Sequence, residues 1–141
     1  ENFGDVRVDV LGPAKLLKNT DSDANNNGLV LLVTYGDISF LITGDMEREE
    51  RRTLEPLPQA TVLKAAHHGS RNGTDGNMLR ELSPEIIILS YARGNSYGHP
   101  HKEVVKAIRE AGVRRFDTAD GTVKLRTDGK GITFERKRVV K

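Results

Sequence analysis

Residues 29–45, Leu-Val-Leu-Leu-Val-Thr-Tyr-Gly-Asp-Ile-Ser-Phe-Leu-Ile-Thr-Gly-Asp, give the clearest indication of the fold. The run 29–35 is nearly all apolar, which is typical of a strand that is buried on both faces. Gly36-Asp37 fits a two-residue hairpin turn of the Gly-X type. The return strand covers residues 38–43 and leads into Gly44-Asp45. This stretch therefore predicts a β-hairpin.

Strands and helices alternate on both sides of this hairpin. A short strand over residues 6–11 precedes it and leads into the polar, turn-rich loop 18–28. After it, the patterns predict helices over 46–54, 77–82 and 101–111, and strands over 61–66, 85–91, 113–116, 122–126 and 132–136. Such alternation indicates an α/β fold with a mixed sheet. We expect the charged helix 46–54 to present a solvated face, and the basic end 136–141 to be a solvated terminus.

Length and composition exclude several classes of protein. The chain has 141 residues, so it is one domain or part of one. It has no cysteine, which excludes disulfides, thiolate metal sites and a cysteine nucleophile. Its formal net charge of +2 does not by itself argue for nucleic acid. No apolar run reaches the ~18 residues of a membrane span. Because it begins Glu1-Asn2 without a signal-peptide pattern, we expect a piece of a longer protein.

Residues able to carry chemistry follow the ends of three predicted strands. Asp45 ends the hairpin, His67-His68-Gly69-Ser70 follows the next strand, and His99-Pro100-His101 lies beyond the strand after that. Ligands bind in the crevice at strand ends in α/β sheets, so we expect these segments to meet along one rim. Since imidazole is the commonest metal ligand, the rim is a candidate metal site.

The same segments also have simpler structural interpretations. Asp45 can be the N-cap of the following helix, with Glu47 exposed in its first turn. His99-Pro100-His101 is also typical of a helix start, with Pro100 at the first helical position. The pair His67-His68 can be solvated loop residues, although such a pair directly after an apolar strand is less ordinary. Ser70 can bond to nearby backbone or orient an imidazole.

At these residues the sequence resembles the C-terminal half of a metallo-β-lactamase-fold domain. More narrowly, it resembles the ComEC family of DNA-internalisation competence proteins. The stretches that carry the resemblance are 25–33, 35–45, 62–70 and 95–101, in that order. The resemblance implies that residues 1–141 form a single, partial domain, half or most of an αββα sandwich with a mixed sheet.

The resemblance also implies a divalent metal centre, zinc or manganese, with two ions in the complete site. Asp45 matches the bridging carboxylate and His67 the last histidine ligand. His68 would face substrate beside it, and His99 would lie near the substrate phosphate as a proton donor or leaving-group partner. Further candidates for substrate contact or support of the site are Asn27, Ser70, Tyr97 and His101.

The main ligand cluster of that fold, His-x-His-x-Asp-His, is absent from this chain. Asn26 and Asn27 also stand where many relatives carry a ligand histidine. We therefore expect this chain to supply one half of a site that a missing N-terminal half or a second copy completes. Half of a sandwich would expose strands such as 29–33 and 86–89, so we expect association.

The complete domain is implied to be a metal-dependent phosphodiester hydrolase that acts on single-stranded DNA during DNA uptake. By the same resemblance it is a soluble domain tethered to a bacterial cytoplasmic membrane protein, and this chain alone would be inactive. Two alternatives stay open, namely a non-catalytic metal-binding, DNA-binding or assembly module, and a small-molecule hydrolase of the same fold.

Overall fold

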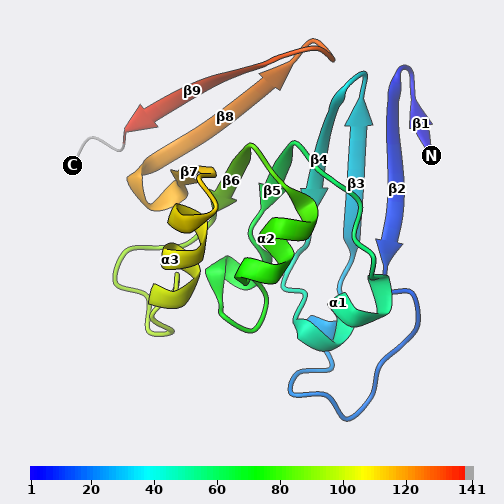
Figure 1. Ribbon diagram of the computed structural model, residues 1–141, viewed down its shortest axis with the longest axis vertical. Helices are drawn as coiled ribbons and strands as arrows, with labels where there is room; N and C mark the ends of the chain where they lie inside the picture. The colour runs from blue at the N-terminus through cyan, green and yellow to red at the C-terminus, as the bar shows by residue number, and fades with distance from the viewer. Residues whose placement is uncertain (139–141) are drawn as a thin grey trace.

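The computed structural model describes residues 1–138, which form a seven-stranded mixed sheet and a separate two-stranded hairpin (Figure 1). The strands are β1 (Asn2–Phe3), β2 (Val6–Gly12), β3 (Val30–Tyr35), β4 (Ile38–Ile42), β5 (Val62–Lys64), β6 (Ile86–Leu89), β7 (Arg114–Asp117), β8 (Gly121–Thr127) and β9 (Ile132–Arg138). Strands β1 to β4 pair antiparallel and β4 to β7 pair parallel. The mixed α/β class expected from the sequence is confirmed, and residues 139–141 of the basic end lie outside the described part.

The hairpin that the sequence predicts is present between β3 and β4. Tyr35 pairs with Ile38, which leaves Gly36 and Asp37 as the two turn residues. Gly36 has a positive φ of 57°, a conformation that glycine adopts without steric cost. The N–H of Asp37 donates to the carbonyl oxygen of Gly129 at 2.7 Å, so the tip of the β8–β9 hairpin rests on this turn.

Helices cover one face of the sheet. The described residues contain α1 (Arg48–Leu54), α2 (Gly76–Leu82) and α3 (Lys102–Glu110). Figure 1 shows α2 and α3 in front of the parallel strands and α1 at the lower edge of the sheet. The main core lies between these layers and is made of the buried residues Leu41, Leu63, Ile87, Leu89, Met78, Leu79, Leu82, Val104 and Ile108. Alternation along each strand turns every second side chain to the opposite face.

The β8–β9 hairpin crosses that opposite face and covers only part of it. Val62, Ile86 and Phe116 are buried there against apolar side chains of the hairpin, among them Val123 and Leu125. The strand 86–89, which we expected to be exposed, is therefore covered, because the hairpin packs over it.

The open part of this face lies over β2, β3 and β4. Leu31 pairs with Val10 on one side and with Ile42 on the other, so the three side chains form a row. Val10 is 64% exposed and Ile42 is 41% exposed. The prediction that 29–35 is buried on both faces is wrong, because only Val30 of β3 is fully buried, and Leu31 to Tyr35 are partly buried.

Helix α1 also departs from expectation. It begins at Arg48 rather than Met46, and its charged residues are not all solvated. Glu50 and Arg51 are buried at 0% and 6% exposure. An amphipathic pattern with charged residues on the inner face gives no apolar period, so the sequence hides this burial. Within residues 1–138, no helix has the length and hydropathy needed to cross a bilayer.

Candidate functional site

The connections that leave β4, β5 and β6 meet at the lower edge of the sheet in Figure 1. They bring Asp45 and all four histidines together. Nε2 of His68 lies 3.3 Å from Oδ1 of Asp45. The ring centroid of His99 lies 5.3 Å from that of His67 and 4.8 Å from that of His101. The three segments singled out from the sequence therefore do meet along one rim.

A strained turn presents the two adjacent histidines. His67 and His68 both adopt positive φ, 45° and 56°, in the left-handed region that non-glycine residues seldom occupy. The N–H of His67 donates to the carbonyl of Gly44 at 3.1 Å, which ties the turn to the end of β4. The N–H of Ser70 closes the turn on the His67 carbonyl at 2.8 Å, and its hydroxyl accepts from the N–H of Asn72 at 3.3 Å. Ser70 thus braces the turn through backbone.

The tautomer of His68 follows from its partners. Its Nδ1 lies 2.6 Å from the carbonyl oxygen of Ser90, and because a carbonyl only accepts, Nδ1 carries the hydrogen. In the neutral ring Nε2 then faces Asp45 with a lone pair. Two acceptor atoms 3.3 Å apart are satisfied by a cation between them, either a proton or a metal ion. Two ligands of one zinc ion at ~2.1 Å are also about 3.0–3.4 Å apart, so the spacing fits both.

Glu47 is a member of the cluster that the sequence analysis missed. Its side chain is only 6% exposed, and its Oε1 lies 2.9 Å from Nδ1 of His67. Asn25 donates to the same oxygen at 3.2 Å. Nδ1 of His67 is buried and makes no well-aligned hydrogen bond within residues 1–138. Glu47 therefore faces an imidazole nitrogen that needs a partner.

The expectation that Asp45 caps the helix and leaves Glu47 exposed is wrong. Glu47 itself holds the N-cap position, with extended backbone and no side-chain cap bond. The apolar residue Met46 is fully buried between the two acids and anchors this short stretch. An apolar residue between two acids was the available signal, because a solvated helix start does not need one.

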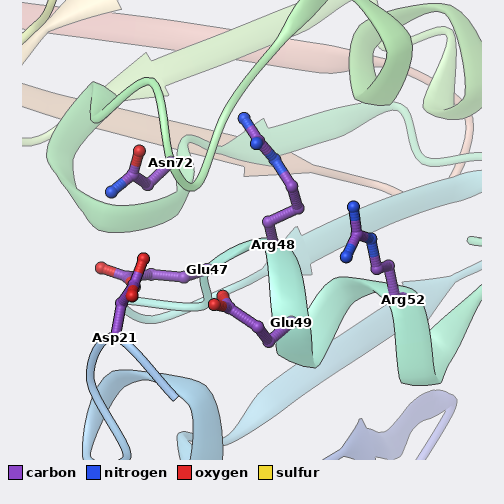
Figure 2. A pocket seen from close by; sticks show the side chains of 6 residues that line it. All are labelled: Asp21, Glu47, Arg48, Glu49, Arg52 and Asn72. Atoms are coloured by element: carbon purple, nitrogen blue, oxygen red, sulfur yellow. The ribbon is translucent and has the colours of Figure 1, made fainter.

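Glu47 also lines a small pocket, whose lining side chains are drawn in Figure 2. It has a volume of about 160 Å³, below the roughly 300 Å³ of typical ligand sites. The acids Asp21, Glu47 and Glu49 gather on one side of the view, and Arg48 and Arg52 lie on the other. Because the pocket is small and its charges are mixed, we do not assign it as a ligand site and treat it as the edge of the carboxylate–histidine cluster.

A larger cleft of about 440 Å³ opens on the other side of the histidines. Its lining residues are His68, Ser90, Tyr91, Ala92, Asn95, Tyr97, His99 and Thr118. Tyr97 is 76% exposed and its ring lies nearly parallel to that of His99, with centroids 5.8 Å apart and 24° between the planes. The volume lies within the range of substrate sites.

The pKa of His99 is lower than that of an ordinary histidine. Burial lowers the pKa of His99 from its ordinary value, and the charges of His101, His67 and His68 lower it further, whereas Asp45 opposes them. His99 is therefore a neutral ring at neutral pH. The structure starts α3 at Lys102, so the prediction that Pro100 is the first helical residue is wrong.

Two more groups complete the surroundings. Burial lowers the pKa of Lys64, and the charge of Asp45 opposes that shift. Nζ of Lys64 donates to the carbonyl of Ala65 at 2.7 Å. His101 accepts at Nδ1 from the N–H of Arg71 at 3.0 Å, which joins the turn of the adjacent histidines to the start of α3. Lys64 was not singled out from the sequence, because a lysine in a strand carries no pattern of its own.

Asn27 braces the polar loop. Its amide accepts from the N–H of Leu17 at 2.7 Å and donates to the carbonyls of Leu17 and Asp23 at 2.9 and 2.6 Å. Its neighbour Asn25 is the asparagine that reaches the cluster, through Glu47. The loop therefore supports the site through a residue other than the candidate.

The donors fit a divalent metal in kind. The cluster offers two carboxylate–imidazole pairs, Asp45 with His68 and Glu47 with His67, and zinc and manganese both accept such ligands. In residues 1–138 no group of three or more His, Cys, Asp or Glu side chains is placed to hold a metal ion. The facing acceptors of Asp45 and His68 are what a cation would satisfy.

Fold and site together define a mixed α/β unit with a carboxylate–imidazole cluster at the ends of its parallel strands. No family model matches the chain. It is similar to ComE operon protein 3 of Bacillus subtilis, with 35% identity over 114 residues, which is 78% of this chain and 15% of that protein.

Two further relatives also match most of the chain. Competence protein ComA of Neisseria gonorrhoeae is 30% identical over 124 residues, 84% of this chain and 18% of that protein. Recombination protein 2 of Haemophilus influenzae is 32% identical over 104 residues, 73% of this chain and 13% of that protein. The chain thus spans less than a fifth of the length of these relatives.

Proposed function

We propose that the chain is part of a metal-dependent phosphodiester hydrolase that cleaves single-stranded DNA during DNA uptake. The observation that carries the proposal is the facing of Asp45 Oδ1 and His68 Nε2 at 3.3 Å, two acceptors that one cation between them would satisfy. The relatives named for competence and for recombination support DNA uptake as the setting. The rest of each relative lies outside the matched segment, so the activity of the whole protein is part of this proposal.

The geometry supports a fuller set of metal-facing groups than Asp45 and His67 alone. Ligand histidines commonly hold their second nitrogen on a carbonyl or carboxylate. His68 does this on the Ser90 carbonyl, and His67 has Glu47 beside its Nδ1. Both rings are thereby held with Nε2 free for a ligand role. When bound, zinc or manganese would supply an ionised water near neutral pH and offset phosphate charge.

His99 is proposed to bind the phosphate. Its lowered pKa keeps the ring neutral at pH 7, so it donates one N–H hydrogen bond to a phosphate oxygen. This role suits it better than protonation of the leaving oxygen, which needs a charged ring. Lys64, close to Asp45, adds positive charge that favours an anionic substrate.

The remaining ligands are proposed to come from outside this chain. A helix-covered sheet whose other face carries one crossing hairpin and an open apolar region is what half of an αββα metallo-β-lactamase sandwich would present. A missing N-terminal half or a second copy would bring the His-x-His-x-Asp-His cluster or its equivalent. The parent is proposed to be tethered to a bacterial cytoplasmic membrane.

The open apolar face also favours a second candidate, a non-catalytic assembly module. Val10 and Ile42 are exposed on it, and such patches commonly bind another protein surface. In that case the chain would associate with its partner whether or not a metal is bound.

Metal binding tests the proposed hydrolase first. Zinc and manganese are titrated calorimetrically into the wild-type chain, Asp45→Asn and His68→Gln, with Asp9→Asn on β2 as the control. We expect each cluster substitution to weaken binding at least tenfold and the control to bind as wild type. Unchanged affinity in both cluster variants would remove the basis of the proposal.

Cleavage is then measured on the complete parent protein with a labelled single-stranded oligonucleotide. Asp45→Asn in that protein should abolish metal-dependent cleavage while leaving its assembly intact, as judged by size-exclusion chromatography. Intact assembly together with an inactive wild-type parent would instead favour the assembly module.

A further inference from the structure

We infer that the cleft beside the histidine cluster binds a nucleobase by stacking, without reading which base it is. The inference rests on the proposed function, since the base belongs to the nucleotide whose phosphate lies at His99. His68 and His99 line both the cluster and the cleft, so the two sites are continuous. A base in the cleft would therefore belong to the nucleotide that carries the reacting phosphate.

The aromatic wall of the cleft is suited to stacking. Tyr97 is 76% exposed, and the ring of His99 lies nearly parallel to it, 5.8 Å away at 24°. Its other face is open to a ligand. Tyr91 is a second aromatic residue among those that line the cleft. Proteins that bind single strands without sequence preference use such exposed rings, because every base has a π-face.

Several polar groups of the cleft are already engaged within the described residues. The carbonyl of Ser90 accepts from His68, and the hydroxyl of Thr118 accepts from the N–H of Tyr91 at 3.1 Å. Both atoms of the Asn95 amide bond within its own loop, the nitrogen at 2.9 and 2.6 Å and the oxygen at 3.0 Å. Base-edge readout needs free donors and acceptors in fixed positions, as in duplex recognition. With these groups engaged, the exposed ring of Tyr97 is the main surface that the cleft offers to a base.

The test measures the binding of 5′-labelled oligonucleotides to the 141-residue chain by fluorescence anisotropy. EDTA is present so that no cleavage occurs. The probes are oligo(dT), oligo(dA), oligo(dC) and an oligomer of abasic units of the same length. The variants are Tyr97→Ala, Tyr97→Phe and, as an exposed aromatic outside the cleft, Phe3→Ala. Tyr97 is largely exposed, so its replacement should leave the fold intact.

We expect Tyr97→Ala to weaken binding by about 5- to 100-fold, the effect of losing one base–aromatic stack. Tyr97→Phe and Phe3→Ala should bind as wild type. The three base-containing probes should agree within a few-fold, and the abasic probe should match the loss seen in Tyr97→Ala.

Three outcomes would overturn the inference. They are equal binding of the abasic probe, no effect of Tyr97→Ala, or a strong preference for one base. Competition by phosphocholine but not by deoxynucleotide would likewise assign the cleft to a small cationic ligand. Because binding is read without metal, stacking can succeed where the metal titration fails, and the reverse, so the two proposals fail separately.

Discussion

Glu50 is the buried carboxyl group that nothing in the site uses. It is 0% exposed, and neither oxygen meets a hydrogen-bond partner within residues 1–138. Burial raises the pKa of Glu50 to about 7, from an ordinary value of 4.5. The folded chain thus keeps this proton up to about pH 7, whereas the unfolded chain releases it near 4.5. The contribution of Glu50 to the free energy of unfolding therefore decreases as pH rises through this window.

Glu50→Gln isolates this effect. At ~1.4 kcal/mol per pKa unit, the charged carboxylate destabilises the fold by up to roughly 3 kcal/mol above pH 7. We expect the variant to unfold in urea like wild type at pH 4.5 and to be more stable by about 1–3 kcal/mol at pH 8. Glu49→Gln on the same helix is the control. Parallel pH profiles for Glu50→Gln and wild type would contradict the assignment.

Glu47 allows a prediction about His67. The carboxylate lies 2.9 Å from Nδ1 of the ring, and loss of such a partner typically lowers metal affinity 10–100-fold. We expect Glu47→Gln to bind zinc about 10–100-fold more weakly by calorimetry, while thermal unfolding without metal changes little.

The ¹⁵N chemical shifts of the His67 ring give a second readout of Glu47. They should report a proton on Nδ1 in wild type and a mixture of tautomers in Glu47→Gln. Identical ring shifts in both proteins, with equal zinc affinity, would mean that Glu47 does not position the ring.

The residues of the cluster divide by how they could be found. Asp45 and the histidines could be predicted because strand ends are visible in the sequence and meet in any parallel sheet. Glu47 and Asn25 could not, because their contacts depend on a left-handed turn at His67 and on a loop that folds back over α1. Periodic apolar patterns reveal strands and helices. The contacts of Glu47 and Asn25 are made by irregular segments, which have no such pattern.

At the scale of elements, the tight turn Ala66–Gly69 joins two parts of the site. Gly69 has a φ of 83°, and a Cβ on it would lie 2.7 Å from Cβ of Pro100 and 2.8 Å from Cδ2 of Leu89. Its carbonyl accepts from the N–H of His101 at 3.0 Å. The turn therefore packs directly against the loop that carries His99.

Gly69→Ala should push these two segments apart. Gly94→Ala is a matched control, because Gly94 also has a positive φ of 69° but no atom within 4 Å of the added Cβ. We expect Gly94→Ala to show only the backbone effect and Gly69→Ala to lose a further 1–3 kcal/mol or so from overpacking. Chemical denaturation of both variants measures the difference. Equal losses would show that the turn tolerates the added methyl group.

The elements themselves were largely predictable, and their ends were not. Apolar runs and alternation located β2 to β9 and the three helices within a few residues. The two-residue strand β1 carries too few residues for any period, and it exists because Asn2 and Phe3 pair with Arg7 and Val6. The start of α1 moved to Arg48 because the backbone at Glu47 is extended to meet His67.

At the scale of the whole molecule, coverage of the sheet is the property that single segments cannot reveal. Burial of β3 was expected from its apolar run, but burial on the second face needs another layer. The β8–β9 hairpin supplies that layer over β5 to β7, near Phe40 of β4 and at the turn of Gly36. The row Val10, Leu31 and Ile42 is left without one within residues 1–138. An apolar run in the sequence can therefore indicate either a buried core strand or a surface that binds a partner.

This open row predicts self-association of the isolated chain. Exposed contiguous apolar surface on a sheet favours a second copy when no other partner is supplied. By size-exclusion chromatography with light scattering, we expect wild type to form dimers or larger species as concentration rises. Val10→Glu combined with Ile42→Thr should shift it toward monomer, since it places charge and a hydroxyl in the row.

Leu16→Glu is the control for this experiment, because Leu16 is an apolar loop residue that is 75% exposed outside the row. It should leave the association of the chain unchanged. Adding the segment that precedes this chain in its parent should suppress self-association in wild type, because both would occupy the same face. If wild type stays monomeric at high concentration, the row is a tolerated surface. The need for a covering partner, and with it the half-domain interpretation, would then lose its physical basis.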